Sequence, residues 1–502
     1  MKKTDKLHEL IRSMTMSEKR YFKLFAGRHT IGEQNNYIAL FEVLESLPAY
    51  DPQKVAEKLD RAGLPVRHLA SDKNYLYNLI LKGLSAFYAG KTITQKIKEL
   101  LHQVEILYER GMYDQGLELI IIARDLAQKY ELFPLLIEIS HWERKALTFR
   151  GDTSQLARAH TEVLGYMAQM DNLHAFIHLH NQMKELQQRI QRARAPEDVT
   201  RLHQFITHPF LASEEIALTF QARILYWHIM GLYYYTLGDT AREGEVQETL
   251  IQHMSSRPDY IQDFPLEYIL VYGRWLTLSL AAPEAMFAEY MEVFMAFPQN
   301  LRRPRRDVEA QVETEAALIQ VERLMRMGMI PEAQAALGSL QEVLRRHDRH
   351  LSLRQRCIGH LLPALIQAAA GQPRLALPGL NTILNTYPEA QCPDLYAAAR
   401  LLNLMVHADL GNASVVNYEA TSWHRYLLQH QPYCQAELWL MDFFMRLTRD
   451  GRKHPLPLSA WVGIRDTLRQ LQDDSLQALP VSAPDILAWL NTKIDQISAE
   501  ST

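Results

Sequence analysis

The stretch RILYWHIMGLYYYTLGDT, residues 223–240, combines two glycines with several aromatic residues at helical spacings. Trp227, Gly231 and Tyr234 follow one another at i, i+4 and i+7, which places them on one face of a helix. Gly231 leaves room for a second helix to approach closely, and Trp227 and Tyr234 fill the space beside it. Gly238 permits the left-handed backbone conformation that ends many helices. The stretch therefore predicts the first helix and the turn of a helical hairpin.

Similar turns recur along the chain, each with a glycine between two amphipathic helical patterns. Successive turn glycines are separated by 40, 87, 90, 43, 40 and 40 residues. The two long gaps are each close to two periods, and Ala195-Pro196 and Ala282-Pro283 are turn-like sequences near their midpoints. A period of roughly 40 to 45 residues is typical of helical repeat proteins. The turn glycines are Gly111, Gly151, Gly238, Gly328, Gly371, Gly411 and Gly451.

The composition agrees with a folded helical protein. Hydrophobic residues make up 47% of the 502 residues and charged residues 22%, whereas alternating, β-branched runs typical of strands are nearly absent. We therefore predict an all-α fold with helices of roughly 12 to 18 residues. About nine antiparallel helix pairs over residues 95–490 are expected to bury their apolar faces against one another in a solenoid.

The stretch 223–240 also resembles the first helix and turn of a tetratricopeptide repeat. That family's pattern has a large aromatic residue, a small residue and a second aromatic residue, followed by Gly-Asp or Gly-Asn at the turn. Trp227, Gly231, Tyr234 and Gly238-Asp239 match these positions. The resemblance implies a right-handed superhelix whose concave face binds a peptide or a helix.

Two other segments match parts of the second helix of that repeat. Ala376 follows a turn glycine by five residues, and Gly116 and Ala123 occupy the two small positions of an earlier unit. No unit matches the whole pattern, and the period exceeds the family's usual 34 residues, so we expect longer helices or longer linkers than in the standard repeat.

Residues 1–94 follow a different pattern. Thr15 and Glu18 form a predicted capping box, a second helix is expected near residues 37–46, Pro52 begins a third, and a long fourth helix ends at Gly90. The segments SEKRYFKLF and KNYLYNLIL resemble those of an uncharacterised family of bacterial tetratricopeptide-like proteins, which has no assigned activity. We predict an N-terminal helical cap or bundle over residues 1–94 and a repeat array over residues 95–502.

Two basic segments suggest a further interaction. Residues 1–30 contain eight Lys or Arg against three acids, and RRPRR at residues 302–306 forms a predicted loop between repeats. We interpret the first segment as part of a cap that closes the end of the array. The alternative is a helix-turn-helix-like module that contacts nucleic acid. The candidate basic residues are Lys19, Arg20, Lys23, Arg28, Arg302, Arg303, Arg305 and Arg306.

Motifs for catalysis or cofactor binding are missing from the sequence. SAFYAGKTITQ has Ser85 where a phosphate-binding loop needs glycine, and no strand precedes it, so Gly90 is predicted to end a helix. His174 and His178 share a helical face but lack further zinc ligands nearby, which favours exposed histidines. We therefore expect no enzyme activity, no cofactor and no metal; an undetected catalytic site in the groove is the alternative. Cys357, Cys392 and Cys434 are expected to pack as small apolar residues.

The expected function is that of a non-catalytic scaffold, which binds a partner protein or peptide in the concave groove of the array. The alternative is a regulator with a nucleic-acid-binding N-terminal module and a partner-sensing array. Aromatic and cationic side chains at inward positions suit an extended peptide. Counting back from each turn places inward the residues Lys98, Tyr108, His141, Lys145, His228, Tyr235, Tyr272 and Arg326.

The expected cellular compartment rests on two features that the sequence lacks, an apolar signal segment and a membrane-spanning run. The N-terminal stretch MKKTDKLHELIRSMTMSEKR interrupts its apolar positions with charges, and the apolar runs elsewhere are shorter than a membrane span. We therefore expect a cytoplasmic protein that does not insert into membranes.

Overall fold

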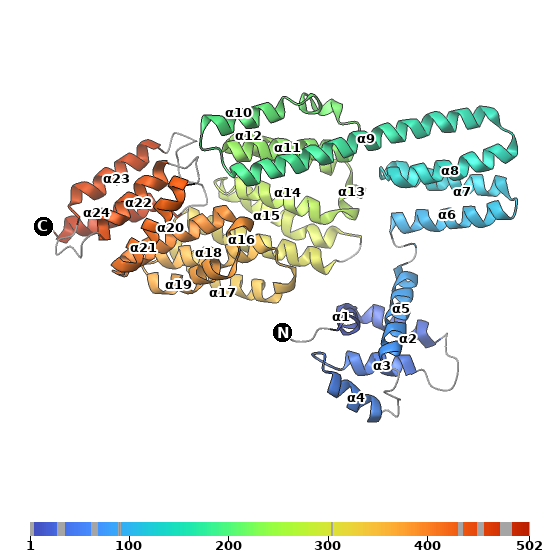
Figure 1. The fold of residues 1–502 in the computed structure, drawn as a ribbon, viewed down its shortest axis with the longest axis horizontal. Helices are drawn as coiled ribbons and strands as arrows, with labels where there is room; N and C mark the ends of the chain where they lie inside the picture. The colour runs from blue at the N-terminus through green and yellow to red at the C-terminus, as the bar shows by residue number, and fades with distance from the viewer. Residues whose placement is uncertain are drawn as a thin grey trace. The chain divides into compact units, whose positions relative to one another are not determined.

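The computed structural model describes residues 5–27, 36–61, 69–88, 90, 92–302, 305–429, 435–448, 456–471 and 484–500. Over these ranges the chain forms 24 α-helices and no β-strand, which confirms the predicted all-α class for this part of the chain (Figure 1). Two compact units are present, a first unit of Met1–Ala168 and a second unit of Gln169–Thr502. No described helix combines the length and the apolarity needed to cross a membrane.

The first unit begins with a bundle of five helices that has its own hydrophobic core. Phe22, Phe41, Leu44, Leu76 and Ile80 are all buried in this core. The four helices predicted for residues 1–94 correspond to α2 to α5, and α1 is an additional short helix. The bundle consists of α1 (Lys6–Ser13), α2 (Met16–Gly27), α3 (Asn36–Glu45), α4 (Pro52–Arg61) and α5 (Leu69–Tyr88).

The capping box predicted at the start of α2 is present. The backbone N–H of Thr15 donates to the Glu18 carboxylate, and the backbone N–H of Glu18 donates to Thr15 Oγ1 at 3.3 Å. These two bonds satisfy donors that the first turn of a helix leaves unpaired.

Three further helices of the first unit, and a fourth that continues into the second, form hairpins in chain order. The turns after α6 and α8 contain Gly111 and Gly151, with φ angles of +71° and +75°. The helices are α6 (Ile93–Glu109), α7 (Tyr113–Lys129), α8 (Phe133–Arg150) and α9 (Thr153–Ile190).

In the second unit the helices pack against their neighbours in chain order. Helix α16 shows how the cores connect: Val312 and Ile319 contribute to the core shared with α14 and α15, whereas Leu318 and Val321 contribute to the core shared with α17 and α18. The helices are α10 (Pro196–Ile206), α11 (Phe220–Leu237), α12 (Thr240–Ser255), α13 (Pro258–Asp263), α14 (Pro265–Leu278), α15 (Glu284–Ala296), α16 (Arg306–Arg326), α17 (Ile330–Arg346), α18 (Leu353–Ala369), α19 (Pro373–Thr386), α20 (Pro393–Asp409), α21 (Ala413–Gln429), α22 (Gln435–Thr448), α23 (Leu458–Leu471) and α24 (Ile486–Glu500).

Residues 223–240 form the first helix and turn of a hairpin, as predicted. Gly238 ends α11 with φ +84°. A Cβ at Gly231 would lie 3.0 Å from Nε2 of Gln247 on α12, so this glycine does sit at a close approach of two helices. Trp227 packs against the core between α11, α12 and α14.

The left-handed turns are confirmed at six of the seven predicted glycines, since Gly451 lies outside the described residues. The regular period is interrupted between Gly151 and Gly238, where α9 alone spans 38 residues. This exceeds the predicted helix length because no proline stands between Thr153 and Ile190, and the first stop signal is the Ala195-Pro196 turn.

Candidate functional site

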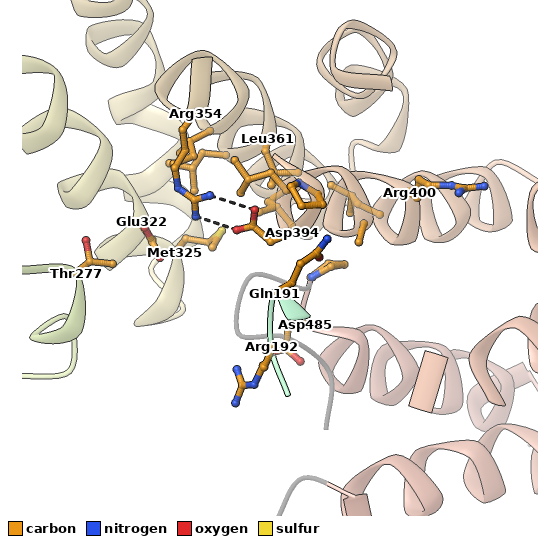
Figure 2. A pocket seen from close by; sticks show the side chains of 18 of the residues that line it. Gln191, Arg192, Thr277, Glu322, Met325, Arg354, Leu361, Asp394, Arg400 and Asp485 are labelled. Atoms are coloured by element: carbon orange, nitrogen blue, oxygen red, sulfur yellow. Dashed lines mark hydrogen bonds and ion pairs between the residues drawn. The ribbon is translucent and has the colours of Figure 1, made fainter. Parts of the chain in front are cut away.

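The second unit contains a pocket of about 2920 Å³, called the large pocket here. Its lining comes from helices between α9 and α24, and α11, α14, α16, α18, α20 and α22, the first helices of six successive hairpins, all contribute side chains. Figure 2 shows part of this lining, with side chains from several helices directed into the pocket. The charged or polar groups that stand on these first helices include Tyr235, Arg274, Glu315, Arg354, Asp394 and Glu437.

An ion pair between α18 and α20 stands in the pocket wall (Figure 2). Arg354 Nη1 and Nη2 donate to the two carboxylate oxygens of Asp394 at 3.1 and 2.9 Å. Two parallel bonds fix the orientation of both planar groups, so the pair is more rigid than a single contact would be. The Arg354 side chain is still 51% exposed, which leaves part of the guanidinium open to a ligand.

A second ion pair joins α14 to α12 at the pocket wall. Arg274 donates to Glu243 Oε1 at 2.7 Å, and its guanidinium lies 5.1 Å from the centre of the Tyr235 ring. Burial raises the pKa of Glu243, and the charge of Arg274 opposes this shift. Tyr235, Arg274 and Glu243 therefore give this part of the pocket wall an aromatic ring next to an ion pair without net charge.

Two other carboxyl groups of the lining have no cation within ion-pair distance among the described residues. Glu315 on α16 accepts a hydrogen bond from the Gln355 amide at 3.2 Å, and Glu437 on α22 has no such partner. Burial raises the pKa of both groups. The charge of Arg354 partly opposes this shift at Glu315, and the charge of Arg194 partly opposes it at Glu437.

The connection from α9 to α10 also lines the large pocket, and Figure 2 shows Gln191 and Arg192 there. Gln191 has a φ of +59°, an unusual conformation for a residue other than glycine. Two sets of bonds hold the segment: the Asp198 carboxylate accepts from the backbone N–H of Arg194 at 3.1 Å, and the Ala193 N–H donates to the Thr236 carbonyl at 2.8 Å. The strained turn is therefore anchored to the end of α11.

Two of the predicted groove residues, Tyr235 and Arg326, line the large pocket. Arg326 pairs with Glu322 on its own helix at 2.6 Å. Tyr272 differs from the expectation: it is 6% exposed and stacks on Phe294 at 5.5 Å within the core around α14 and α15. It is therefore a packing residue and does not reach the pocket.

His228 lies away from the large pocket, in a polar cluster with residues of α9, α13 and α14. Its ring centre is 5.7 Å from that of His180, and its Nε2 is 3.8 Å from Glu267 Oε1. Tyr260 donates to Glu267 at 2.8 Å. Burial, together with the charges of Lys184 and His228, lowers the pKa of His180 to about 4, against the opposing charge of Glu267.

This cluster predicts that acid destabilises the second unit. The unfolded chain has an ordinary histidine pKa near 6.5, so it binds more protons than the folded state between pH 6.5 and 4. Stability is expected to fall through this window as the pH is lowered, by about 1 to 2 kcal/mol for His180 after discounting its partial exposure.

Native-state hydrogen exchange of α9 and α11 amides at about pH 7 and about pH 5 measures the effect. His180→Gln should reduce the difference between the two conditions, whereas His174→Gln, at an exposed position of the same helix, should leave it unchanged. An equal response of the two variants would contradict the assignment.

In the first unit the structure brings Tyr108 and Lys145 together in an aromatic cluster. Tyr113 and Phe149 stack at 5.2 Å, Tyr108 lies 5.7 Å from Trp142, and Lys145 Nζ stands 4.4 Å above the Trp142 ring. Phe149 is 64% exposed, so the cluster forms part of the surface.

The other two predicted groove residues of the first unit are His141 and Lys98. His141 borders the aromatic cluster, with its ring 6.1 Å from that of Trp142. Burial lowers the pKa of His141, and the charges of Lys145 and Arg144 act in the same direction. Lys98 is exposed on α6 and has no ring contact or ion pair within the described part of the chain.

The candidate basic residues near the N-terminus are largely neutralised. Lys19 pairs with Glu45 at 3.3 Å, and Lys23 pairs with Glu42 and Glu45 at 3.1 and 3.2 Å, which ties α2 to α3. Arg20 is exposed. These pairs reduce the positive charge that the bundle presents to a phosphate backbone.

The basic loop before α16 is neutralised in a similar way. Arg302 pairs with Asp259 at 2.5 Å and Arg305 with Asp307 at 2.6 Å, while Arg306 is exposed. Of the eight candidate basic residues, Arg28 and Arg303 lie outside the described residues.

Sequence reasoning missed the ion pair of the pocket wall, although a signal for it exists. Arg354 and Asp394 each stand 17 residues before a turn glycine, at Gly371 and Gly411. Equal offsets place them at equivalent positions of successive helices, where opposite charges can meet across neighbouring hairpins. Counting from the start of each first helix would have identified them.

Within the described part of the chain, no group of three or more His, Cys, Asp or Glu side chains is arranged to hold a metal ion. His174 and His178 are both exposed, and Cys357 and Cys392 are buried, as predicted; Cys434 lies outside the described residues. No protein-family model, curated protein or solved structure matches the chain.

Proposed function

We propose that the protein is a non-catalytic interaction scaffold of the tetratricopeptide-like superfamily, in which the large pocket holds a peptide or helix of a partner protein. The observation that carries the proposal is the continuous lining of the pocket by the first helices of successive hairpins. In a right-handed superhelix of such hairpins, the first helices form the concave face. The N-terminal bundle then acts as a cap for the array.

The size of the large pocket supports a polypeptide ligand. A helix about 10 Å across that rises 1.5 Å per residue occupies on the order of 120 Å³ per residue. A volume of about 2920 Å³ thus corresponds to roughly 24 helical residues. Its lining mixes apolar side chains such as Leu270 and Trp489 with paired and unpaired charges, which suits an amphipathic segment.

The alternative function, a regulator with a nucleic-acid-binding N-terminal module, has weaker support. Lys19 and Lys23 already pair with carboxylates of α3, and phosphate contacts would have to break these pairs. The scaffold proposal requires no such rearrangement.

Two leucines with similar exposure provide a test. Leu270 lines the large pocket and is 64% exposed, whereas Leu375 on α19 is 60% exposed and lies outside the lining. Leu270→Arg is expected to weaken binding of a pocket ligand by about tenfold or more, because a buried leucine contact is worth about 1.5 to 3 kcal/mol. Leu375→Arg should leave binding within about twofold, as for a neutral surface substitution.

The ligands for this test come from selection of displayed peptides of about 20 residues against the full-length protein. Fluorescence anisotropy then gives the affinity of each enriched peptide for the parent protein and for the two variants. The proposal fails if no peptide is enriched, or if every enriched peptide is equally sensitive to both substitutions.

A further inference from the structure

The charges that line the large pocket are unevenly compensated. Four of its nine carboxyl groups have a cation from another helix or from the next turn of the same helix. Those pairs are Glu243 with Arg274, Glu322 with Arg326, Asp394 with Arg354, and Asp409 with Lys493. Of the five without an ion pair among the described residues, Asp198 accepts backbone N–H bonds, and Glu389 and Asp485 are exposed. Glu315 and Glu437 are left as partly buried carboxyl groups that lack a cation.

Glu315 stands in the middle of α16, on the side that faces α18. Among the described residues its carboxylate accepts one hydrogen bond, from the neutral Gln355 amide, and the same amide also donates to Gln311 at 2.8 Å. Because the Gln355 amide is shared with Gln311, hydrogen bonding offsets little of the desolvation of the Glu315 carboxylate. Burial therefore raises the pKa of Glu315.

Glu437 is on α22, in its first turn. Its carboxylate lines the pocket without a hydrogen bond or ion pair in the described residues, and burial raises its pKa. Arg194 acts on it only through the longer-range electrostatic field. An enclosed carboxylate of this kind is stabilised when a ligand brings a positive charge.

We propose that the large pocket takes a basic partner segment whose Lys or Arg side chains pair with Glu315 and Glu437. The inference rests on the proposed function and adds the chemical class of the ligand. Helices α16 and α22 are separated by three hairpin steps, and at about 8 to 10 Å a step their axes lie on the order of 25 to 30 Å apart.

That separation sets the spacing of the two cations in the ligand. An extended segment rises about 3.3 Å per residue and spans this distance in about nine residues or fewer. A helix rises 1.5 Å per residue and needs up to about 20 residues. Leu270 and Trp489 in the same lining favour apolar residues between or beside the two cations.

Two model peptides test the charge assignment. Both are amphipathic sequences of about 20 residues with leucines at helical spacing; one carries lysines on its polar face and the other carries glutamates. Fluorescence anisotropy with the full-length protein should show tighter binding of the lysine peptide by about tenfold or more, decreasing with added salt.

The test variant combines Glu315→Gln with Glu437→Gln. Its control is Glu332→Gln, at an exposed position of α17 outside the lining. The double variant should weaken the lysine peptide by about tenfold, and the control should leave its affinity unchanged. The charge-reversed pair Glu315→Lys and Glu437→Lys should shift the preference to the glutamate peptide. Circular dichroism of each variant checks that the helical content is retained.

The outcomes separate this inference from the proposed function. If the glutamate peptide binds as well as the lysine peptide, or if the double variant retains full affinity, the charge assignment is overturned. Peptides enriched by display that respond to Leu270→Arg would still uphold the scaffold function in that case. If neither the model peptides nor any displayed peptide binds, both proposals are overturned.

Discussion

Replacing Arg323 by leucine is expected to lower the free energy of unfolding of the second unit by about 3 to 4 kcal/mol. Arg323 is 4% exposed on α16, and its guanidinium donates to the backbone carbonyls of Leu280 and Ala282 in the turn before α15. It also pairs with Glu284 at 3.0 Å and lies 4.1 Å from the centre of the Phe287 ring. Leucine fills much of the volume but leaves two carbonyls without donors, each a loss of about 1 to 2 kcal/mol.

The matched control is Arg345→Leu. Arg345 is 77% exposed on α17, and its ion pair within the described residues is with Glu342, three residues earlier on its own helix. Its replacement should change stability by no more than about 0.5 kcal/mol. Urea unfolding together with hydrogen exchange of α14 to α16 amides measures both variants. Equal destabilisation by the two substitutions would show that the buried contacts of Arg323 do not hold this turn.

The parts of the fold that could be predicted from sequence are those set by local backbone physics. Glycines such as Gly111, Gly371 and Gly411 are needed where φ is positive, and they therefore mark hairpin turns in a single sequence. The Thr15–Glu18 capping box is equally local. The length of α9 is not set by local signals over residues 153–190, which contain no proline, so its extent up to the Ala195-Pro196 turn depends on tertiary packing.

Site residues were harder to predict, because they depend on which helix covers which face. Tyr235 could be placed in the pocket by counting three residues back from Gly238, a turn whose geometry is fixed. Tyr272 precedes a turn without a glycine, and an error of one residue rotates a helical position by about 100°. His228 lies on the same helix as Tyr235, but His180 of α9 packs beside it, and no local pattern reveals that contact.

The charged residues of the lining likewise include some contacts that the sequence can reveal and others that depend on tertiary packing. The pairing of Arg354 with Asp394 follows from equivalent positions in successive hairpins, and a repeat alignment within the chain can therefore find it. The isolation of Glu315 and Glu437 cannot be found in this way, because it depends on cations that neighbouring helices fail to supply. A missing partner is a property of the assembled pocket, whereas a turn is a property of a few adjacent residues.

Alanine at Gly379 is expected to destabilise the α18–α19 hairpin by about 2 to 3 kcal/mol. A Cβ at this position would lie 2.7 Å from the backbone carbonyl oxygen of His360 and 3.7 Å from the Cβ of Ala364, both on α18. A side chain could rotate away, but a carbonyl inside a helix cannot move without moving the helix. The two helices must separate, and Leu380 and Ile383, which are fully or almost fully buried, then lose packing contacts.

The same substitution at Gly338 is the control, and it should have the opposite sign. Gly338 lies inside α17, and a Cβ there would meet nothing within 4 Å. Alanine is favoured over glycine in a helix interior by about 0.5 to 1 kcal/mol, so Gly338→Ala should stabilise the protein by that amount. This propensity term is common to both positions. The difference between the two variants, measured by thermal unfolding and by hydrogen exchange of α17 to α19 amides, therefore isolates the steric term at the α18–α19 contact. Stabilisation by both substitutions would mean that these helices do not approach as closely as their backbones indicate.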